Sequence, residues 1–291
     1  MAGTKIVAGL IALALGCGCS RSRPIVVGSK NFTEQLVLGE ILAQYLERRL
    51  GQRVERKLNL GGTLVAHQAL VNGEIDLYPE YTGTALTAVL KLPLLPDRAR
   101  VLDQVRSEYG KRWRLEWMAP FGFDNSFAMV IHGDEARRSN LHTLSDAARQ
   151  ETGWVMGVGY EFLQRPDGLA GLVKTYGLAI KGQVMTMDLG LLYRALDQRQ
   201  VDMIAASATD GMLSVLDVTV LQDDKHYFPP YEAAAVVRTD SLASRPGMRD
   251  ALQALAGKLT DRTMQKLNYE VDGRHRPLAE VAREFLNSGR E

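Results

Sequence analysis

Short apolar segments that suit β-strands alternate with longer segments that suit helices, and this alternation restricts the possible folds more than any other feature of the sequence. Residues 25–27 are apolar and β-branched, as a short buried strand is. Apolar residues then recur at helical spacing from Thr33, the expected N-cap, to Leu46. A strand, a helix and a strand follow at 54–60, 63–71 and 75–78. This βαβαβ unit predicts an α/β domain with a mostly parallel sheet.

A second α/β unit of similar length begins after Trp117. Its expected strands are 126–131, 154–158, 184–187 and 201–206. Its expected helices are 144–149, 168–176 and 189–197. After two prolines at 229–230, one more strand is expected at 233–238 and helices fill the rest. We therefore expect lobe 1 to comprise residues 24–122 and 229–291 and lobe 2 residues 123–228, with a ligand in the cleft between them.

Residues 1–19 have the pattern of an export signal. Lys5 precedes an apolar run at 6–15, which suits a signal-peptide core and is too short to span a bilayer. The run ends in small residues before a cysteine, which resembles the lipobox of bacterial lipoproteins, where that cysteine becomes the acylated N-terminus. We expect lipidation at Cys17, with Cys19 as the alternative. The other interpretation is a cleavage site elsewhere, with both cysteines incidental.

Composition argues against several classes of function. The formal net charge is +1 and no basic face carries interleaved aromatic residues, so we expect no binding to nucleic acid. The chain has two cysteines, both in the export signal, so the mature body contains no disulfide. Its five histidines lack metal-ligand spacing, so no metal is expected. No nucleophile–base pair or phosphate loop is present, and we expect neither a cofactor nor enzymatic activity.

A set of short motifs extends over nearly the whole chain after residue 24. They are 28–35 (GSKNFTEQ), 61–63 (GGT), 74–84 (EIDLYPEYTGT), 121–128 (FGFDNSFA), 164–168 (QRPDG), 208–211 (ATDG) and 228–234 (FPPYEAA). Together they resemble the substrate-binding proteins of osmoprotectant ABC transporters, which are receptors for glycine betaine, choline, carnitine and related solutes. The resemblance implies the bilobal type II periplasmic-binding-protein fold, with two mostly parallel α/β lobes joined by a hinge.

The resemblance also implies an aromatic cage. A quaternary ammonium group cannot donate a hydrogen bond and is held by cation–π attraction. The corresponding positions are Tyr81, Phe127 and Tyr231, each of which would otherwise be interpreted as a packed core or hinge aromatic. Ser207 stands where relatives with a four-walled box have a tyrosine. We expect the missing wall to cost about 0.5–2 kcal/mol for a trimethylammonium ligand, and the space beside Ser207 suits a longer betaine, such as carnitine or ergothioneine.

The carboxylate of a betaine needs donors at the other end of the site. Arg165 is the expected partner, because a guanidinium binds a carboxylate through two parallel hydrogen bonds; its other interpretation is a solvated loop charge. Lys30 and Thr84 correspond to family positions that help to hold the ligand. The weaker candidates are Gln35, Tyr78 and Asp210. For Asp210 we favour a role as cap of the helix after Gly211. The Gly61-Gly62-Thr63 turn is interpreted as either an anion site or a helix cap.

The sequence therefore predicts a monomeric, membrane-anchored lipoprotein, periplasmic or extracytoplasmic, that captures a quaternary ammonium solute by hinge closure. Its partners would be that solute, the lipid anchor in the membrane and the ABC permease subunits of the inner membrane. One alternative keeps the fold and the transport role but changes the ligand, to ergothioneine or an amino acid. Another is a ligand sensor that is not coupled to transport. An enzyme on the same scaffold would need a convergent acid, base or nucleophile.

Overall fold

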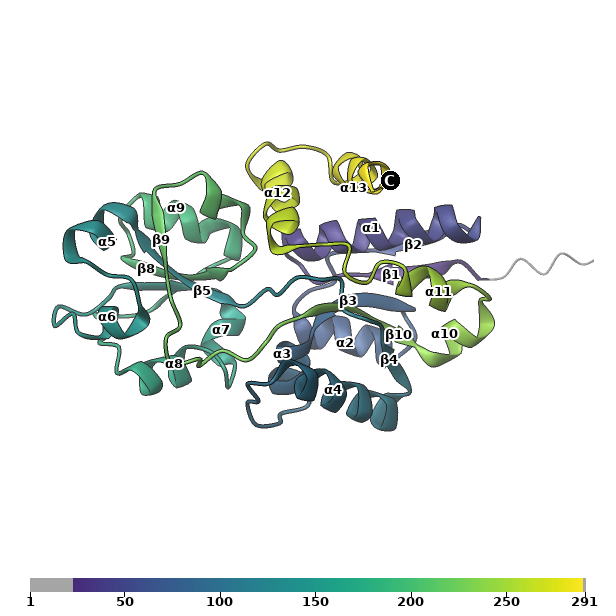
Figure 1. Cartoon of the computed structure of the whole chain (residues 1–291), viewed down its shortest axis with the longest axis horizontal. Coiled ribbons are helices and arrows are strands. Elements are labelled where there is room, and N and C mark those ends of the chain that lie inside the picture. Colours follow the sequence, from purple (N-terminus) through teal and green to yellow (C-terminus); the bar gives the residue numbers. More distant parts are fainter. Residues whose placement is uncertain (1–22, 290–291) are drawn as a thin grey trace, which may run out of the picture.

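The structure is a computed structural model and describes residues 23–289, which form two five-stranded sheets flanked by helices (Figure 1). The first sheet has the order β2-β1-β3-β10-β4, with β1 (Ile25–Gly28), β2 (Val54–Lys57), β3 (Leu77–Tyr81), β4 (Leu115–Trp117) and β10 (Ala233–Arg238). The second has the order β7-β6-β8-β5-β9, with β5 (Phe127–His132), β6 (Met156–Val158), β7 (Met185–Thr186), β8 (Met203–Ser207) and β9 (Val218–Leu221). The predicted bilobal α/β architecture is confirmed. The expected export signal, with Cys17 and Cys19, lies outside the described residues.

Four strands of each sheet run in one direction and the fifth runs against them, so the expectation of mostly parallel sheets is confirmed. In lobe 1, β1 pairs in parallel with β2 and β3, whereas β10 runs antiparallel to β3 and β4. In lobe 2, β6 pairs in parallel with β7 and β8, whereas β5 runs antiparallel to β8 and β9. The two antiparallel strands, β5 and β10, are the ones that the chain enters from the other lobe. They are not preceded by a crossover helix on their own sheet, which is what makes neighbouring strands parallel.

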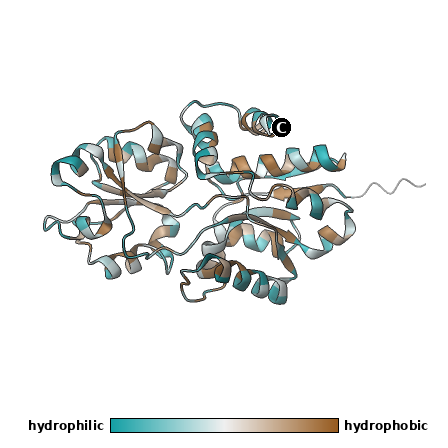
Figure 2. Cartoon of the chain, in the orientation of Figure 1, coloured by the Kyte–Doolittle hydropathy of each residue, from teal (hydrophilic) through white to brown (hydrophobic). Residues whose placement is uncertain are grey.

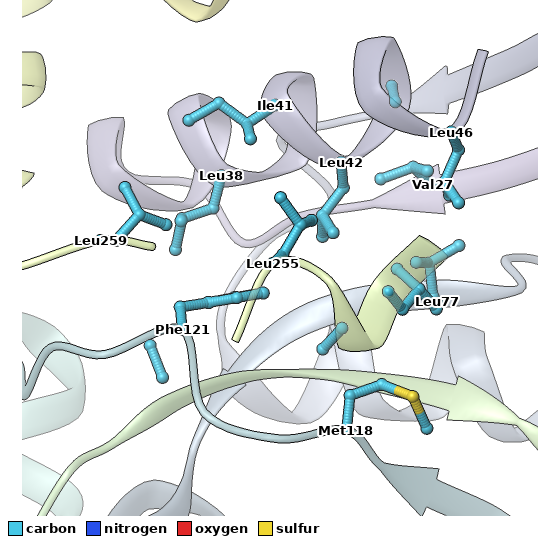
Figure 3. Packing of buried hydrophobic residues seen from close by; sticks show 14 of the residues in the cluster. Val27, Leu38, Ile41, Leu42, Leu46, Leu77, Met118, Phe121, Leu255 and Leu259 are labelled. Carbon is cyan, nitrogen blue, oxygen red and sulfur yellow. The ribbon is translucent and has the colours of Figure 1, made fainter. Parts of the chain in front are cut away.

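Helices cover both faces of the lobe 1 sheet. On one face lie α1 (Thr33–Leu50), α10 (Thr239–Ser244), α11 (Met248–Gln253), α12 (Asp261–Asp272) and α13 (Leu278–Ser288). On the other lie α2 (Thr63–Val71), the π-helix η1 (Ala85–Val89) and α4 (Arg98–Trp113), with the one-turn α3 (Thr82–Thr84) before η1. Figure 3 shows Leu38, Ile41 and Leu42 of α1 in the same buried cluster as Val27 and Leu77 of the sheet. Side chains alternate between the two faces of a strand, and here each set packs against one layer of helices, so both faces of the sheet are buried.

Lobe 2 is built in the same way. Helices α5 (Gly133–Ser139), α6 (Leu144–Ala148), α7 (Tyr160–Gln164) and α8 (Leu169–Tyr176) cover one face of its sheet. The other face packs against α9 (Leu192–Asp197), next to the short 3₁₀ helices η2 (Leu189–Leu191) and η3 (Gly211–Ser214). The strands of both sheets are largely hydrophobic, and the helices show hydrophilic outer faces (Figure 2). None of the helices in residues 23–289 has the length and apolarity that crossing a membrane requires.

The start of α1 differs from the prediction. Phe32, not Thr33, is the N-cap residue, and it makes no side-chain cap. The Thr33 hydroxyl donates instead to Asp272 Oδ1 of α12 at 2.6 Å. A tertiary contact therefore takes the hydroxyl that local sequence rules assign to capping.

Two crossing segments join the lobes and lie side by side. Asn125 N donates to Tyr231 O at 3.1 Å, and Tyr231 N donates to Asp124 Oδ2 at 3.1 Å. Asp124 and Glu232 form an isolated antiparallel bridge between the same segments. In addition, α12 of lobe 1 packs against η3 of lobe 2. The two crossing segments are therefore connected to each other by hydrogen bonds where they pass between the lobes.

Candidate ligand-binding site

The turn after β3 and the second crossing segment fit each other closely. Tyr81 ends β3 and is buried, and Gly83 follows in the turn. A Cβ atom on Gly83 would lie 2.7 Å from Tyr231 Cδ1 and 2.6 Å from the carbonyl oxygen of Pro230. Thr82 also donates from its backbone N to Glu232 O at 3.0 Å. The Tyr231 ring can therefore rest on this turn only because residue 83 is glycine.

Replacement of Gly83 by alanine is expected to lower the free energy of unfolding by about 1–3 kcal/mol, because the added methyl group overpacks against backbone and ring atoms. Urea unfolding of residues 23–291 measures this change. Gly190→Ala is the control, since a Cβ there meets no atom within 4 Å. A Gly83→Ala protein as stable as the Gly190→Ala protein would contradict the packing described here.

Lys30 and Glu80 form a buried ion pair beneath Tyr81. Lys30 Nζ lies 2.5 Å from Glu80 Oε1 and 5.0 Å from the centroid of the Tyr81 ring. Glu80 also accepts hydrogen bonds from Tyr81 N at 2.7 Å and from the Tyr78 hydroxyl at 3.0 Å. Tyr78 itself lies in the hydrophobic cluster under α2 and α4 and is fully buried. The ring of Tyr81 therefore lies next to a cation, Lys30. Tyr78 lies in the core and reaches the site only by the hydrogen bond from its hydroxyl to Glu80.

Arg165 links the lobes at the end of α7. Its Nη1 donates to Thr84 Oγ1 at 3.1 Å and its Nη2 to Thr87 Oγ1 at 3.3 Å, both in lobe 1. Its Cζ lies 5.3 Å from the centroid of Phe127 and 5.7 Å from that of Tyr231. The side chain is only 7% exposed. Arg165 is therefore a buried interlobe cation over two of the predicted cage aromatics, not a solvated loop charge.

Asp167 neutralises Arg165 and was not predicted as a site residue. It is fully buried and accepts from Arg165 Nε at 2.9 Å and from Nη2 at 2.5 Å. It also accepts from Thr87 Oγ1 at 2.8 Å and from the Tyr231 hydroxyl. Thr87 reaches Asp167 from the π-helix η1, a rare element that is frequent at functional sites. The only signal in the sequence is the position of this aspartate within the QRPDG motif.

Phe127 lies within an aromatic cluster, and Ser207 lies beside it. The Phe127 centroid is 4.7 Å from that of Phe162, 5.6 Å from that of Phe228 and 5.7 Å from that of Tyr231. Ser207 is the direct partner of Phe127 in the β5–β8 ladder. Its hydroxyl contacts Asn125 Oδ1 and lies 3.2 Å from Thr209 Oγ1. The residue that replaces the fourth aromatic is thus part of a polar contact next to Phe127.

The two remaining weaker candidates have different surroundings. Gln35 is fully buried and accepts from Lys30 N at 3.3 Å, while its Nε2 has no hydrogen-bond partner within residues 23–289. Asp210 is the N-cap of η3 and accepts from Met212 N at 2.9 Å, so the favoured capping role is confirmed. Burial raises the pKa of Asp210 to about 6.

Glu34 is a further buried carboxylate that sequence reasoning missed. It accepts hydrogen bonds from the Tyr81 hydroxyl and from Asn125 Nδ2, each at 2.7 Å, and from Asn268 Nδ2 at 3.1 Å. The Thr209 hydroxyl of lobe 2 donates to it as well. Burial raises the pKa of Glu34 above its ordinary value. Its place in the GSKNFTEQ motif was the only available signal, and an acidic residue in the first turn of a helix has an ordinary structural explanation.

The Gly61-Gly62-Thr63 turn contacts a carboxylate of the protein itself. Glu161 of α7 accepts from Thr63 N at 2.6 Å and from Thr63 Oγ1 at 3.0 Å. The N-terminus of α2 thus receives an anionic partner from the other lobe, as helix N-termini favour. With Arg165 and Glu34, this contact holds the two lobes closed on each other.

A separate groove lies away from these residues. It is an open groove of about 560 Å³ between β7 and α9, lined by residues such as Met185, Leu191 and Arg194. It belongs to lobe 2 alone and contains none of the predicted site residues. The predicted residues are instead largely buried at the interlobe boundary, where lobe closure fills the space with their own side chains.

Comparison with known proteins identifies the family of the chain. Residues 23–288 match the OpuAC family, described as the substrate binding domain of ABC-type glycine betaine transport systems. The chain belongs to this family. Its resemblance to osmoprotectant receptors is therefore confirmed, and OpuAC-family domains are transport binding proteins that act outside the cytoplasm, with a small-molecule ligand and a permease as partners.

Two curated relatives and one solved structure are similar to this OpuAC-family protein over more than nine tenths of its length. The carnitine transport binding protein OpuCC of Listeria monocytogenes is 34% identical over 93% of this chain and 88% of its own length. The ergothioneine transport permease/ergothioneine binding protein EgtU of Helicobacter pylori (strain G27) is 34% identical over 91% of this chain and 47% of its own length. A crystal structure of a glycine betaine/carnitine/choline ABC transporter protein is 31% identical, with a TM-score of 0.76, and covers 91% of this chain and 98% of that one.

Proposed function

We propose that this OpuAC-family protein captures a betaine-type quaternary ammonium solute, such as glycine betaine, choline or carnitine, between its lobes and delivers it to an ABC permease. The observation that carries the proposal is the position of the Arg165 guanidinium over the rings of Phe127 and Tyr231. These two rings already accept a buried cation from the protein, and they do so at the boundary that hinge closure would seal. A ligand ammonium makes the same kind of contact.

In this proposal Tyr81, Phe127 and Tyr231 form the cage, and Lys30, Thr84 and Arg165 hold the carboxylate. Asp167 occupies the Nε–Nη2 edge of the Arg165 guanidinium. On the other edge, Nη1 and Nη2 contact the neutral hydroxyls of Thr84, Thr87 and Tyr231. A ligand carboxylate would therefore find one edge of the fork without an anionic competitor. This arrangement supports a zwitterionic ligand with its carboxylate at Arg165.

Hinge closure follows from where these residues come from. Lys30, Tyr81 and Thr84 belong to lobe 1, and Phe127 and Arg165 belong to lobe 2. A ligand that contacts both groups stabilises the closed state through interactions that the open state lacks. We place the lobe boundaries at residues 122–123 and 228–229, within the crossing segments. The protein in this proposal is a monomer without a cofactor, has no catalytic function, and is anchored through Cys17 or, alternatively, Cys19.

Two kinds of ligand fit the proposed transport role. The two relatives above are 34% identical to this chain and have names that give different ligands, carnitine and ergothioneine. Ser207 supports a ligand with a polar group near the cage, because its hydroxyl belongs to a polar contact with Asn125 and Thr209. The alternative is therefore the same transport role with ergothioneine or an amino acid as the ligand.

Calorimetric titration tests the proposal. Residues 23–291 are unfolded and refolded to remove any bound ligand, and are then titrated with glycine betaine, choline, carnitine, ergothioneine and proline. We expect micromolar or tighter binding of at least one quaternary ammonium compound. Binding of proline alone, or of none of these solutes, would contradict the cage assignment.

Substitution of Ser207 by tyrosine is expected to tighten choline binding by up to about 30-fold, because it adds a fourth aromatic wall beside Phe127. Ser207→Leu is the matched control, since it adds bulk and removes the hydroxyl without adding a π-face that attracts cations strongly. Titration of both variants with choline distinguishes the two effects. An equal change in the tyrosine and leucine variants would show that the cation–π interaction is not responsible.

A further inference from the structure

Glu34 accepts hydrogen bonds from four different parts of the structure around the site. Its carboxylate is almost fully buried and lies at the start of α1. Oε1 accepts from the Tyr81 hydroxyl and Asn125 Nδ2, and Oε2 accepts from Thr209 Oγ1 and Asn268 Nδ2. These donors come from the proposed cage, a crossing segment, lobe 2 and α12 respectively. One carboxylate thus contacts both lobes and one of the segments that join them.

The network continues beyond the carboxylate. Asn125 Oδ1 accepts from the Ser207 hydroxyl, and Asn268 Nδ2 also donates to the Thr209 carbonyl at 2.9 Å. The Tyr81 ring is therefore connected through Glu34 to the end of β8, where Ser207 pairs with Phe127. The hydrogen-bonded chain thus runs from the Tyr81 hydroxyl of lobe 1 to Ser207, the ladder partner of Phe127 in lobe 2.

The chemistry of the four contacts requires an acceptor in that position. Hydroxyl and amide groups each donate to Glu34, and an ionised carboxylate can accept from all of them. Within residues 23–289 no lysine, arginine or histidine lies within ion-pair distance of this carboxylate. The hydrogen bonds alone offset the cost of its burial. A glutamine of the same shape would turn an N–H group toward donors and break the network.

We propose that Glu34 is a positioning residue for ligand binding, which fixes the ring of Tyr81 relative to lobe 2 and so couples cage geometry to lobe closure. This inference rests on the proposed function, since it assigns Glu34 a part in the same site. Glu34 does not itself hold the ligand.

Glu161, another carboxylate that joins the lobes, provides the control. Glu161 binds Thr63 across the same boundary, and within residues 23–289 its carboxylate makes no hydrogen bond to a proposed cage residue. Both carboxylates join the lobes, whereas only Glu34 joins them through the cage. A variant at Glu161 therefore reports what loss of an interlobe contact does by itself.

The first test is a set of double-mutant cycles read out as the choline dissociation rate. Tyr81→Phe and Thr209→Val each remove one hydroxyl, and each is expected to speed dissociation by about tenfold or more, since a hydrogen bond to a charged group is lost. In a Glu34→Gln background both substitutions are expected to add little. In a Glu161→Gln background Tyr81→Phe is expected to keep its full effect. Additive effects in the Glu34→Gln background would overturn the proposal.

The second test needs no ligand. The body of the protein has no native cysteine after residue 19, so exposed positions in α4 and α8 can be spin-labelled selectively through Arg100→Cys and Lys174→Cys. Pulsed electron paramagnetic resonance then measures the distance between the two spin labels, one on each lobe. We expect Glu34→Gln and Thr209→Val to lengthen or broaden the distance distribution of the ligand-free protein. An unchanged distribution in both variants would overturn the proposal.

The dissociation rate and the interlobe distance together distinguish a failure of the proposed function from a failure of the role of Glu34. A wild-type protein that binds no quaternary ammonium compound contradicts the proposed function, and the distance measurement then still decides whether Glu34 couples the lobes. A wild-type protein that binds choline while the Glu34→Gln cycle stays additive contradicts the role of Glu34 alone. The milder Tyr81→Phe and Thr209→Val variants keep the test valid if Glu34→Gln does not fold, as a thermal melt would show.

Discussion

Replacement of Arg165 by alanine is expected to weaken the binding of glycine betaine and carnitine by about 30-fold or more and that of choline far less. Truncating one partner of a buried, hydrogen-bonded charge pair costs about 2–5 kcal/mol. Choline lacks the carboxylate and loses only the remaining contacts. Calorimetric titration with all three ligands gives the ratio directly. It isolates the carboxylate contribution, because the ammonium group is common to the three.

The matched control for this prediction uses Asp167. Removal of Arg165 alone leaves the fully buried Asp167 without its cation, which would confuse a change in folding with a change in binding. The comparison is therefore the double variant Arg165→Ala/Asp167→Asn against the wild-type protein, because neither of the two leaves a buried charge of this pair uncompensated. Equal losses of affinity for choline and for glycine betaine in this pair would refute the carboxylate role of Arg165.

Replacement of Asp167 by alanine is expected to lower the free energy of unfolding by about 3–5 kcal/mol, because a buried guanidinium loses its charged partner. Asp167 and the Arg165 side chain are 0% and 7% exposed, so solvent cannot replace the lost contacts. The Thr87 and Tyr231 hydroxyls lose their acceptor as well. Urea unfolding of residues 23–291 with and without the substitution measures the difference.

An exposed ion pair of the same chemistry provides the control for Asp167. Arg137 and Asp217 also form two hydrogen bonds, at 2.8 and 2.7 Å, but their side chains are 64% and 66% exposed. Solvent-exposed pairs contribute little to stability, so Asp217→Ala should change it far less. The account of Asp167 fails if the two alanine variants unfold at the same urea concentration.

The fold could be predicted from sequence where the pattern is local. Period-2 and period-3.6 spacing indicated β1, β3, β5, β8 and β10, together with α1, α2, α8 and α9, and the order of these elements gave two α/β units. The strands β4 and β9 were not predicted, because each is a short edge strand with little sequence to mark it. The directions of β5 and β10 could not be deduced, because they depend on the chain crossing between lobes and not on local spacing.

The site residues that could be predicted are those at positions that match the motifs of the family. The resemblance indicated Lys30, Tyr81, Arg165 and Tyr231, which the structure brings to the interlobe boundary in two groups: Lys30 with Tyr81, and Arg165 with Tyr231. The buried carboxylates that neutralise or connect them were missed. Glu34 meets Thr209 across 175 residues, and Asp167 meets Thr87 across 80. Contacts at that separation leave no periodic signal, and an isolated Asp or Glu in a motif looks like a solvated charge.

A crystal structure of the refolded protein with a quaternary ammonium ligand is the most direct test of the central claim. The account predicts the ammonium group against the faces of Tyr81, Phe127 and Tyr231, with any carboxylate on Arg165. A ligand seated in the groove between β7 and α9, or between the lobes with its carboxylate on the rings, would contradict it.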